Sequence, residues 1–335
     1  MRLKPAGVLI TVAVIALLAY LAFRPKKTAP SREEASREQT ANSTERDTSS
    51  SSSELRRPAA IQEEKEEARE FAYTPEKPEN GTLRGVVELG ATGFNSFIIN
   101  LDNQRRWEII SKDFGESLAY EGLATTEDIR AGLKKYIGSM FDKGVAKKDI
   151  HFVISSGAQK EPKTTVISNE LKKMGYVVNN VTPAEEAKLG LRATVPASFI
   201  ENSFMIDIGS GNTKVSWDEN GSLKTLELPG AKYYEKGTSD DEVYNTAKTQ
   251  ISKIPSDKRN VGFIIGGVPF TLAKQHRKGE ERYTVLKAAD LYKAADKKMG
   301  AGLNIYKAIA DGTQTDTFVF DWDANFTIGF ILALK

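Results

Sequence analysis

The sequence contains no cysteine and only two histidines, His151 and His276. The absence of cysteine excludes disulfides, thiol catalysis, iron–sulfur clusters and cysteine-ligated zinc, and two histidines exclude a multi-histidine metal site. An excess of charge of one sign is also lacking, because 47 Lys and Arg residues nearly balance 45 Asp and Glu residues among 335. A chain this close to neutral lacks the basic surface of a nucleic-acid-binding protein, so we expect no nucleic acid among its partners.

Residues 1–27 are predicted to be a membrane anchor. Their apolar run, Ala6–Phe23, contains no charge and no proline. As a helix the run would measure about 27 Å, close to the thickness of a bilayer's hydrocarbon core. We predict a retained single-pass helix and a location in the cell membrane, with a cleaved signal peptide as the alternative. Similar positive charge on both flanks leaves open which side of the membrane the folded part occupies.

Residues 28–80 are predicted to form a disordered linker. They are rich in Ser, Glu, Thr and Arg, and Leu55 is the only large aliphatic residue between Thr28 and Ala60. Such a stretch buries too little apolar surface to offset the entropy that the chain would lose on ordering.

From residue 81 onward, strand-like and helix-like patterns alternate, which indicates an α/β fold. Runs of β-branched and aromatic residues predict strands at 84–89, 94–101, 107–111, 150–154, 176–181, 204–208, 213–217, 223–228, 261–265 and 317–320. Helical periodicity predicts helices at 126–141, 164–174, 183–191, 241–251, 284–299 and 303–310, followed by an apolar C-terminal helix.

Two acidic, glycine-rich turns occur in this part of the chain. Glu88-Leu-Gly-Ala-Thr-Gly-Phe ends one predicted strand and begins a hairpin, and Asp207-Ile-Gly-Ser-Gly-Asn-Thr does the same later on. The repeated pattern predicts a duplication into lobe I at 81–200 and lobe II at 201–335, with a cleft between them.

The residue types in these turns suit phosphate chemistry. A carboxylate at a strand end can hold a metal ion or orient a water, and adjacent glycines let backbone N–H groups approach phosphate oxygens. A single turn of this kind is more simply explained as a hairpin that needs glycine. Two such turns in matching halves, together with a strand that ends in Gly266-Gly267, favour a polyanion site.

Five segments of the body stand out as a set. They are Val86-Val-Glu-Leu-Gly-Ala-Thr-Gly-Phe, Ser155-Ser-Gly-Ala-Gln-Lys160, Thr182-Pro-Ala-Glu-Glu-Ala-Lys-Leu, Asp207-Ile-Gly-Ser-Gly-Asn-Thr and Ile264-Ile-Gly-Gly-Val-Pro-Phe-Thr-Leu-Ala. In these segments and their order, the chain resembles the exopolyphosphatase/guanosine pentaphosphate phosphohydrolase (Ppx/GppA) family of the actin, Hsp70 and sugar-kinase superfamily, over roughly residues 84–334. The resemblance implies a duplicated two-lobe, actin-like (ribonuclease H-like) ATPase-type fold.

The resemblance also implies an activity, which is hydrolysis of the terminal phosphoanhydride of polyphosphate or guanosine pentaphosphate with Mg²⁺ or another divalent cation. Glu186 matches the glutamate that acts on the attacking water, and Asp207 and Glu88 are the implied metal ligands. The implied phosphate-binding residues are Gly90, Thr92, Lys160, Gly209, Ser210, Gly211, Asn212, Thr213, Gly266 and Gly267. The expected partners are therefore polyphosphate or a guanosine polyphosphate and the membrane, and a homodimer stays open.

Local patterns separate the two adjacent glutamates of the third segment. Thr182 and Glu185 have the spacing of a capping box, with Pro183 at the first helical position, so Glu185 is predicted to cap its helix. Glu186 points elsewhere, either into the cleft as the catalytic group or simply toward the positive end of the helix dipole.

Several positions depart from the family's pattern. Glu88 stands where the first loop has aspartate, and Ala91 and Gly93 replace two serines. Lys160 replaces an arginine, which removes a bidentate donor to phosphate. Lys214 replaces a glutamate beside the expected metal site, where it either grips phosphate or is a surface residue of a strand.

Three functions therefore stay open. The first is a membrane-tethered hydrolase of phosphoanhydrides. The second is a catalytically inactive sensor or scaffold that binds a phosphate ligand. The third is an actin-like nucleotide-binding protein of an envelope assembly, for which ATP would bind at Gly266-Gly267.

Overall fold

A computed structural model describes residues 71–90, 93–115 and 126–334 of the chain. The predicted anchor and the predicted linker up to residue 70 lie outside these ranges. Within the ranges, no helix combines the length and the hydrophobicity that crossing a membrane requires.

The described residues form two mixed sheets with the same strand order. The first sheet has the order β3-β2-β1-β4-β5, and the second has the order β10-β11-β9-β6-β7-β8. The strands of the first are β1 (Thr82–Gly90), β2 (Gly93–Leu101), β3 (Trp107–Gly115), β4 (Ile150–Ile154) and β5 (Val178–Asn180). The strands of the second are β6 (Ser203–Ile208), β7 (Asn212–Glu219), β8 (Ser222–Pro229), β9 (Val261–Gly266), β10 (Tyr283–Leu286) and β11 (Phe318–Asp321).

The two sheets show the predicted duplication directly. In each sheet an antiparallel hairpin opens the lobe, as β1 with β2 and as β6 with β7, and a parallel strand joins its first member, β4 or β9. β6 of the second sheet therefore corresponds to β1 of the first, and β7 corresponds to β2. The pairing places Glu88 near the end of β1 and Asp207 near the end of β6, in matching positions.

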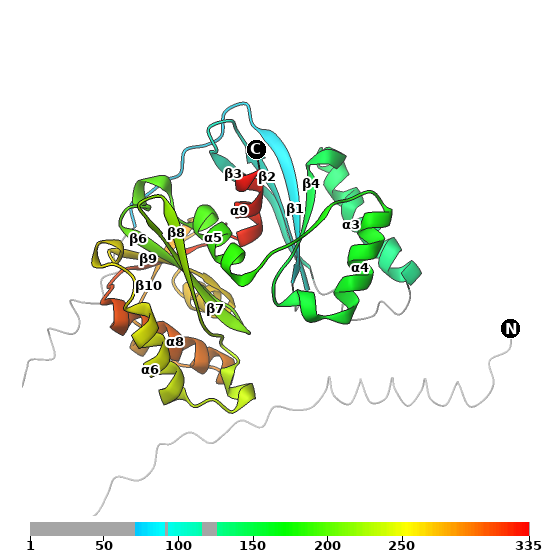
Figure 1. The fold of residues 1–335 in the computed structure, drawn as a ribbon. Helices are drawn as coiled ribbons and strands as arrows, with labels where there is room; N and C mark the ends of the chain where they lie inside the picture. The colour runs from blue at the N-terminus through cyan, green and yellow to red at the C-terminus, as the bar shows by residue number, and fades with distance from the viewer. Residues whose placement is uncertain (1–70, 91–92, 116–125, 335) are drawn as a thin grey trace, which may run out of the picture. The chain divides into compact units, whose positions relative to one another are not determined.

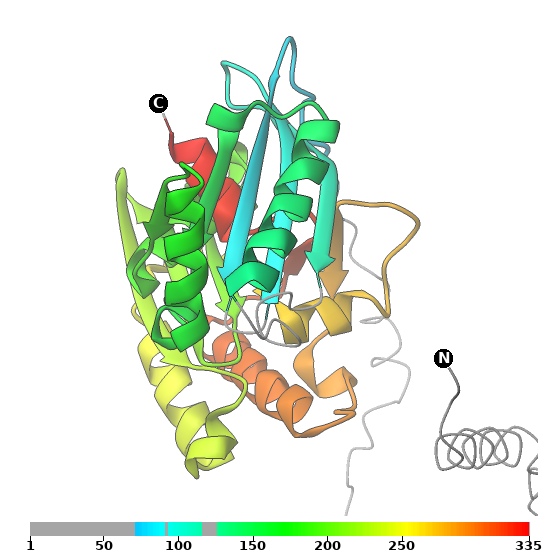
Figure 2. The ribbon, with the colours of Figure 1, turned by 90° about the vertical axis from the view of Figure 1, so that its right-hand side faces the viewer.

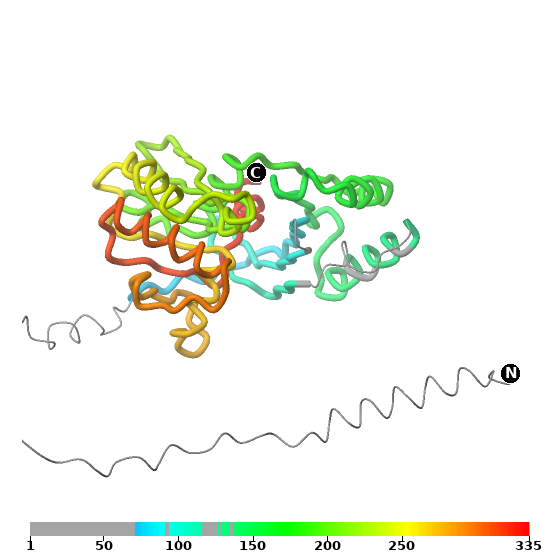
Figure 3. Tube along the Cα trace, turned by 90° about the horizontal axis from the view of Figure 1, so that it is seen from below, coloured from blue at the N-terminus to red at the C-terminus, as the bar shows by residue number. Residues whose placement is uncertain are grey.

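Helices cover both faces of each sheet (Figures 1 and 2). Their bounds are α3 (Thr126–Asp142), α4 (Pro162–Lys173), α5 (Pro183–Thr194), α6 (Asp240–Ile251), α7 (Gly267–Ala273), α8 (Lys297–Thr313) and α9 (Phe326–Ala333). Successive residues of β1 face opposite sides of the first sheet. Val87 packs in the core shared with α3 and α4, whereas Val86 packs in the core shared with α9. In the second sheet, α6 and α8 lie side by side over one face, in yellow and orange in Figure 3.

Two helices do not stay with the lobe that their sequence position predicts. α5 lies in predicted lobe I but packs on the second sheet, where Leu191 joins Met205 and Phe263. α9 lies in predicted lobe II but packs on the first sheet, where Ile328 and Ile331 join Val86. The two helices also contact each other, so the lobes are connected through an α5–α9 interface.

One predicted helix is partly a strand. The sequence favoured a helix at 284–299, but Tyr283–Leu286 forms β10 at the edge of the second sheet and α8 begins only at Lys297. The Tyr-Thr-Val-Leu run pairs antiparallel with β11, and this pairing outweighs the weak helical periodicity that follows it.

The segment Phe71–Asn80, which we call the strap, lies within the predicted linker but packs on the folded body. Phe71 contacts the rings of Phe199 at 5.0 Å and Tyr283 at 5.4 Å, both in the apolar cluster on the second sheet. At its other end, the backbone N–H of Glu79 donates to the Asp102 carboxylate in the first lobe at 3.0 Å. The body therefore begins earlier than composition predicted, because two aromatic side chains of the strap supply apolar surface to bury.

Candidate functional site: three carboxylates and a lysine

The two acidic turns contribute to one cluster of charged side chains. Lys214 Nζ lies 2.7 Å from Glu186 Oε2 and 3.7 Å from Asp207 Oδ2. Glu88, from the other sheet, is close enough for its charge to interact with those of Glu186, Asp207 and Lys214. We call these four residues the carboxylate–lysine site. It brings together the predicted catalytic residue, both predicted metal ligands and the lysine that departs from the family's pattern.

Local structure explains why Glu186 and Glu185 differ. The Thr182 hydroxyl accepts from the N–H of Glu185 at 3.2 Å, and the Glu185 carboxylate accepts from the N–H of Thr182 at 2.7 Å. The predicted capping box is therefore confirmed. Glu186, the next residue of α5, is 2% exposed and points into the carboxylate–lysine site.

Both carboxylate oxygens of Glu186 have donors. Oε2 is paired with Lys214, which comes from β7 of the second lobe, and Oε1 accepts the backbone N–H of Ser156. Ser156 lies in the loop after β4 of the first lobe. One carboxylate thus connects the two lobes, and an ion pair this buried holds its geometry far better than a surface pair does.

The position of Lys214 follows from strand geometry. β6 and β7 are antiparallel, and Lys214 lies directly opposite Asp207. Side chains alternate along a strand, so Lys214 and its neighbour Thr213 face opposite sides of the sheet. Burial by itself lowers the pKa of the Lys214 ammonium, but the carboxylates of Asp207 and Glu186 outweigh that effect and hold its pKa above the ordinary value.

The corresponding pair in the first lobe uses an amide in place of the ammonium. Asn95 lies opposite Glu88 in the β1–β2 hairpin, and its Nδ2 donates to Glu88 Oε2 at 2.8 Å. Asn325, the N-cap of α9, donates to the same oxygen at 3.1 Å. Burial raises the pKa of the Glu88 carboxyl; these two hydrogen bonds lower it, and the nearby Glu186 and Asp207 raise it further, so the net shift is upward.

In the second turn, more donors are hydrogen-bonded to nearby protein groups than the sequence predicted. The N–H of Gly209 donates to the carbonyls of Asp207 and Asn212, both at 3.1 Å, so it is not free to bind phosphate. The buried Thr213 hydroxyl donates to the Pro229 carbonyl at 2.9 Å, and Asn212 donates to Glu227 at 2.7 Å. In these three positions local hydrogen bonds take the donors that were expected to hold a ligand.

Two residues of that turn, Ser210 and Gly211, could still bind phosphate as the sequence predicted. Within the described ranges, the N–H groups of Ser210 and Gly211 have no hydrogen-bond acceptor, and Gly211 is exposed. An added Cβ on Gly211 would meet nothing within 4 Å. These two N–H groups are therefore the donors of the turn that an anion could reach.

The remaining predicted phosphate residues divide into three groups. Gly90 ends β1 and pairs with Gly93, and Thr92 lies outside the described residues. Lys160 is exposed on a short 3₁₀ turn after Ser156. Gly266 has φ 112° and lies so close to the Ile208 backbone that a side chain would overlap it, so β6–β9 packing requires this glycine; Gly267 begins α7.

The residues present do not fit a divalent cation. Mg²⁺ needs several oxygen ligands at about 2.0–2.1 Å in octahedral geometry. Here the ammonium of Lys214 lies between two of the three carboxylates, and two amide groups hold the third. Among the described residues, no group of three or more acidic or histidine side chains is arranged to hold a metal ion. The expected metal ligands Glu88 and Asp207 are brought together, but with a cation already beside them.

Three contributors to this site were not predicted: Asn95, Asn325 and the N–H of Ser156. Asn95 could have been found from the sequence, because the hairpin register that pairs Glu88 with its cross-strand neighbour follows from the turn. Asn325 reaches the site only through the packing of α9, for which the sequence carries no local signal. Ser156 lies in the segment Ser155–Lys160 that the sequence singled out, but its contact with Glu186 depends on the packing of the loop after β4.

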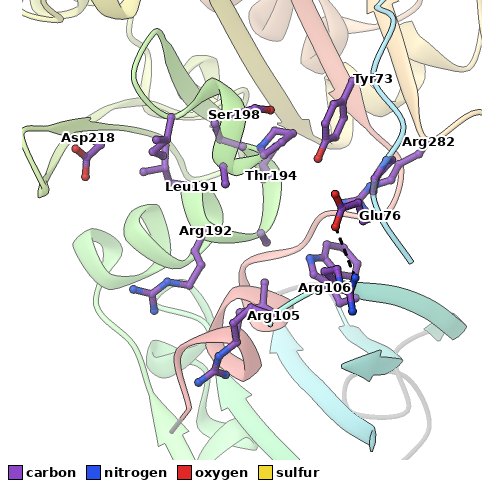
Figure 4. A pocket seen from close by; sticks show the side chains of 18 of the residues that line it. Tyr73, Glu76, Arg105, Arg106, Leu191, Arg192, Thr194, Ser198, Asp218 and Arg282 are labelled. Atoms are coloured by element: carbon purple, nitrogen blue, oxygen red, sulfur yellow. Dashed lines mark ion pairs between the residues drawn. The ribbon is translucent and has the colours of Figure 1, made fainter. Parts of the chain in front are cut away.

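A separate cavity of about 870 Å³ lies at the opposite ends of the strands (Figure 4). It is lined by the strap, the β2–β3 loop, the end of α5 and the β7–β8 turn, and none of the predicted site residues lines it. Arg106 faces Glu76 at 3.7 Å, and Arg282 pairs with Asp321 while lying 4.2 Å from the centre of the Trp107 ring. Carboxylates of the protein therefore neutralise two of its arginines.

The sequence matches no known protein family profile and no curated protein. Solved structures do match its fold. A Ppx/GppA family member from Aquifex aeolicus is 15% identical, with a TM-score of 0.57, and the match covers 75% of this chain and 97% of that one. The described body has the Ppx/GppA fold.

A second structure of this kind agrees with the first. An exopolyphosphatase from Cytophaga hutchinsonii is 14% identical, with a TM-score of 0.54 over 75% of this chain and 96% of that one. These matches agree with the predicted duplicated, two-lobe α/β fold. At such low identity they show the fold alone, so any activity has to be argued from the site itself.

Proposed function

We propose that this protein is a receptor for a phosphate-terminated polyanion, polyphosphate or a guanosine polyphosphate, that binds its ligand without hydrolysing it. The observation that carries the proposal is the state of Glu186. Both of its oxygens are engaged, one by Lys214 and one by the N–H of Ser156. A carboxylate held by a lysine and a backbone donor is a poor acceptor for the proton of an attacking water.

The ligand would be held by groups of the second turn. The free N–H groups of Ser210 and Gly211 point to a small anion, as backbone donors at such turns do in phosphate sites. Lys214 contributes a positive charge, with 11% of its side chain exposed. The Ppx/GppA fold, shared with an exopolyphosphatase, supports a phosphate-terminated ligand over other anions.

Electrostatics predict how this binding depends on pH. Three carboxylates surround one ammonium, so the fully ionised site repels an anion. Glu88 is the carboxyl whose pKa is raised, and its protonation removes one negative charge. Anion binding should therefore become tighter as the pH falls through the pKa of Glu88, and Glu88→Gln should bind with little pH dependence in that range.

The test combines calorimetry and phosphate release on the full-length protein, with polyphosphate, guanosine pentaphosphate and ATP as separate ligands. The proposal expects saturable binding of one of the first two and no release of phosphate above the level of Glu186→Gln. Failure of all three to bind would refute it. Binding of ATP alone would favour the actin-like nucleotide-binding alternative.

Hydrolysis is the second candidate, and the burial of Glu186 beside the second turn is the observation that favours it. Turnover would require the Lys214–Glu186 pair to open when substrate binds, so that Glu186 can accept a proton. Phosphate release by the unmodified protein that Glu186→Gln abolishes, with an unchanged melting temperature, would establish this function in place of the first.

We also propose that the receptor is tethered to the cell membrane by the apolar run Ala6–Phe23, whose length and lack of charge support a single span. Fractionation of cells that express the full chain, and of cells that express a variant with two aspartates inside the run, tests this. Recovery of both proteins in the soluble fraction would refute the tether.

A further inference from the structure

Lys214 occupies the place that a divalent cation would need. Its ammonium nitrogen lies 2.7 Å from Glu186 Oε2 and 3.7 Å from Asp207 Oδ2, and the charge of Glu88 also acts on it. A metal ion bound by the same oxygens would lie within a few ångströms of this ammonium. Like charges at that distance repel strongly in a buried site, so the ammonium and the metal exclude each other.

The site is also complete without a metal. In each lobe, the residue directly opposite the acid in the hairpin compensates the negative charge of that acid. One such residue donates a hydrogen bond to the carboxylate, and the other lies beside it as a cation. In the first lobe this residue is Asn95, which is hydrogen-bonded to Glu88, and in the second it is Lys214, which faces Asp207. Asn325 adds a second donor to Glu88.

The position of Lys214 cannot be explained as surface solvation. The residue is 9% exposed, and long lysine side chains normally keep their charged end in water. A buried ammonium is stable only where carboxylates pair with it, and here Glu186 and Asp207 do so.

We infer that Lys214 is a built-in counter-cation that takes the place of a divalent metal, and that its ammonium keeps a divalent cation away from the carboxylates of Glu186 and Asp207. The wild-type protein binds no divalent cation there. Removal of the ammonium leaves the carboxylates of Glu186 and Asp207 without their counter-cation and lets a divalent cation bind them, with waters as its other ligands. The inference concerns the protein without its ligand, so it holds or fails separately from the proposed receptor function.

The test is Mn²⁺ binding, measured by electron paramagnetic resonance on full-length protein at mildly alkaline pH with no phosphate compound present. The variants are Lys214→Gln, which removes the charge, and Lys214→Glu, which adds a fourth carboxylate. Lys224→Gln on β8 is the matched control, because Lys224 is on the same sheet with its side chain 45% exposed and outside the site.

The expected result is no saturable Mn²⁺ binding by the wild-type protein or by Lys224→Gln. Lys214→Gln should bind at least about tenfold more tightly than these two, which corresponds to about 1.4 kcal/mol, and Lys214→Glu more tightly still. Mn²⁺ should also raise the melting temperature of the two Lys214 variants and leave the other two proteins unchanged.

Two results would overturn the inference. One is saturable binding of Mn²⁺ to the wild-type protein with the affinity of Lys214→Gln. The other is a folded Lys214→Gln protein that gains no binding. If Lys214→Glu does not fold because its carboxylates repel one another, Lys214→Gln decides the question, since its side chain is neutral.

Discussion

Gly329 of α9 lies directly against the carbonyl oxygen of Leu189 in α5, so closely that a side chain on Gly329 would overlap it. α5 lies in the middle of the body's sequence and α9 at its C-terminal end, and each packs on the sheet of the other lobe. This close approach of two backbones is therefore a point at which the lobes are held together.

Gly329→Ala should destabilise the protein by about 1–3 kcal/mol, because the overlapping atom belongs to the backbone and cannot rotate away. Gly300→Ala is the control. It also places a methyl group on a helix, but the nearest atom, the Ala294 Cβ, would be 3.6 Å away. Urea unfolding measures both; equal stability of the two variants would contradict the packing described for α5 and α9.

Phe71→Ala should lower the free energy of unfolding by about 2 kcal/mol, less than a fully buried Phe→Ala change because Phe71 is only half-buried. The lost contacts are those with Phe199, Phe263 and Tyr283. Leu291→Ala removes an exposed apolar side chain and should have little effect. If both changes were neutral, the strap would be a part of the linker and not of the folded body.

Glu88→Gln should stabilise the protein at neutral and alkaline pH. The folded-state pKa of Glu88 is raised above its unfolded value, so its ionised form is disfavoured in the native state and stability is lost as the pH rises through that pKa. Glutamine cannot ionise, and its oxygen still accepts from Asn95 and Asn325. Thermal melts should show a higher melting temperature than that of the wild-type protein at neutral pH, and the difference should disappear toward about pH 4. An equal gain at every pH would point to packing and not to ionisation.

Thr213→Val should lower the free energy of unfolding and leave the affinity for the ligand unchanged. Its hydroxyl is buried and donates to the Pro229 carbonyl, which would lose its donor at a cost of about 1–3 kcal/mol. Unfolding and calorimetric titration with polyphosphate are measured on the same preparation. A large loss of affinity at unchanged stability would instead assign Thr213 to the ligand, as the sequence suggested.

Much of the fold was predictable because its signals are local. Three short runs rich in apolar residues, with Asn220 and Gly221 at the turn between the last two, identify the meander of β6, β7 and β8. The capping box of Thr182 and Glu185 closes over three residues, so the sequence alone contains both partners. The matching of Glu88 with Asp207 was visible as a repeated motif.

The amino-acid sequence thus determined the strand hairpins, the helix start that orients Glu186 and the presence of two acidic turns, because each depends on neighbours within a few residues. Only the tertiary structure decided that α5 and α9 exchange sheets, that the Gly209 N–H and the Thr213 hydroxyl are used internally, and that Lys214 pairs with Glu186. Those contacts join residues that lie far apart along the chain or depend on a shared register. These contacts are determined by how the sheets and helices pack against one another, and no local sequence pattern contains that information.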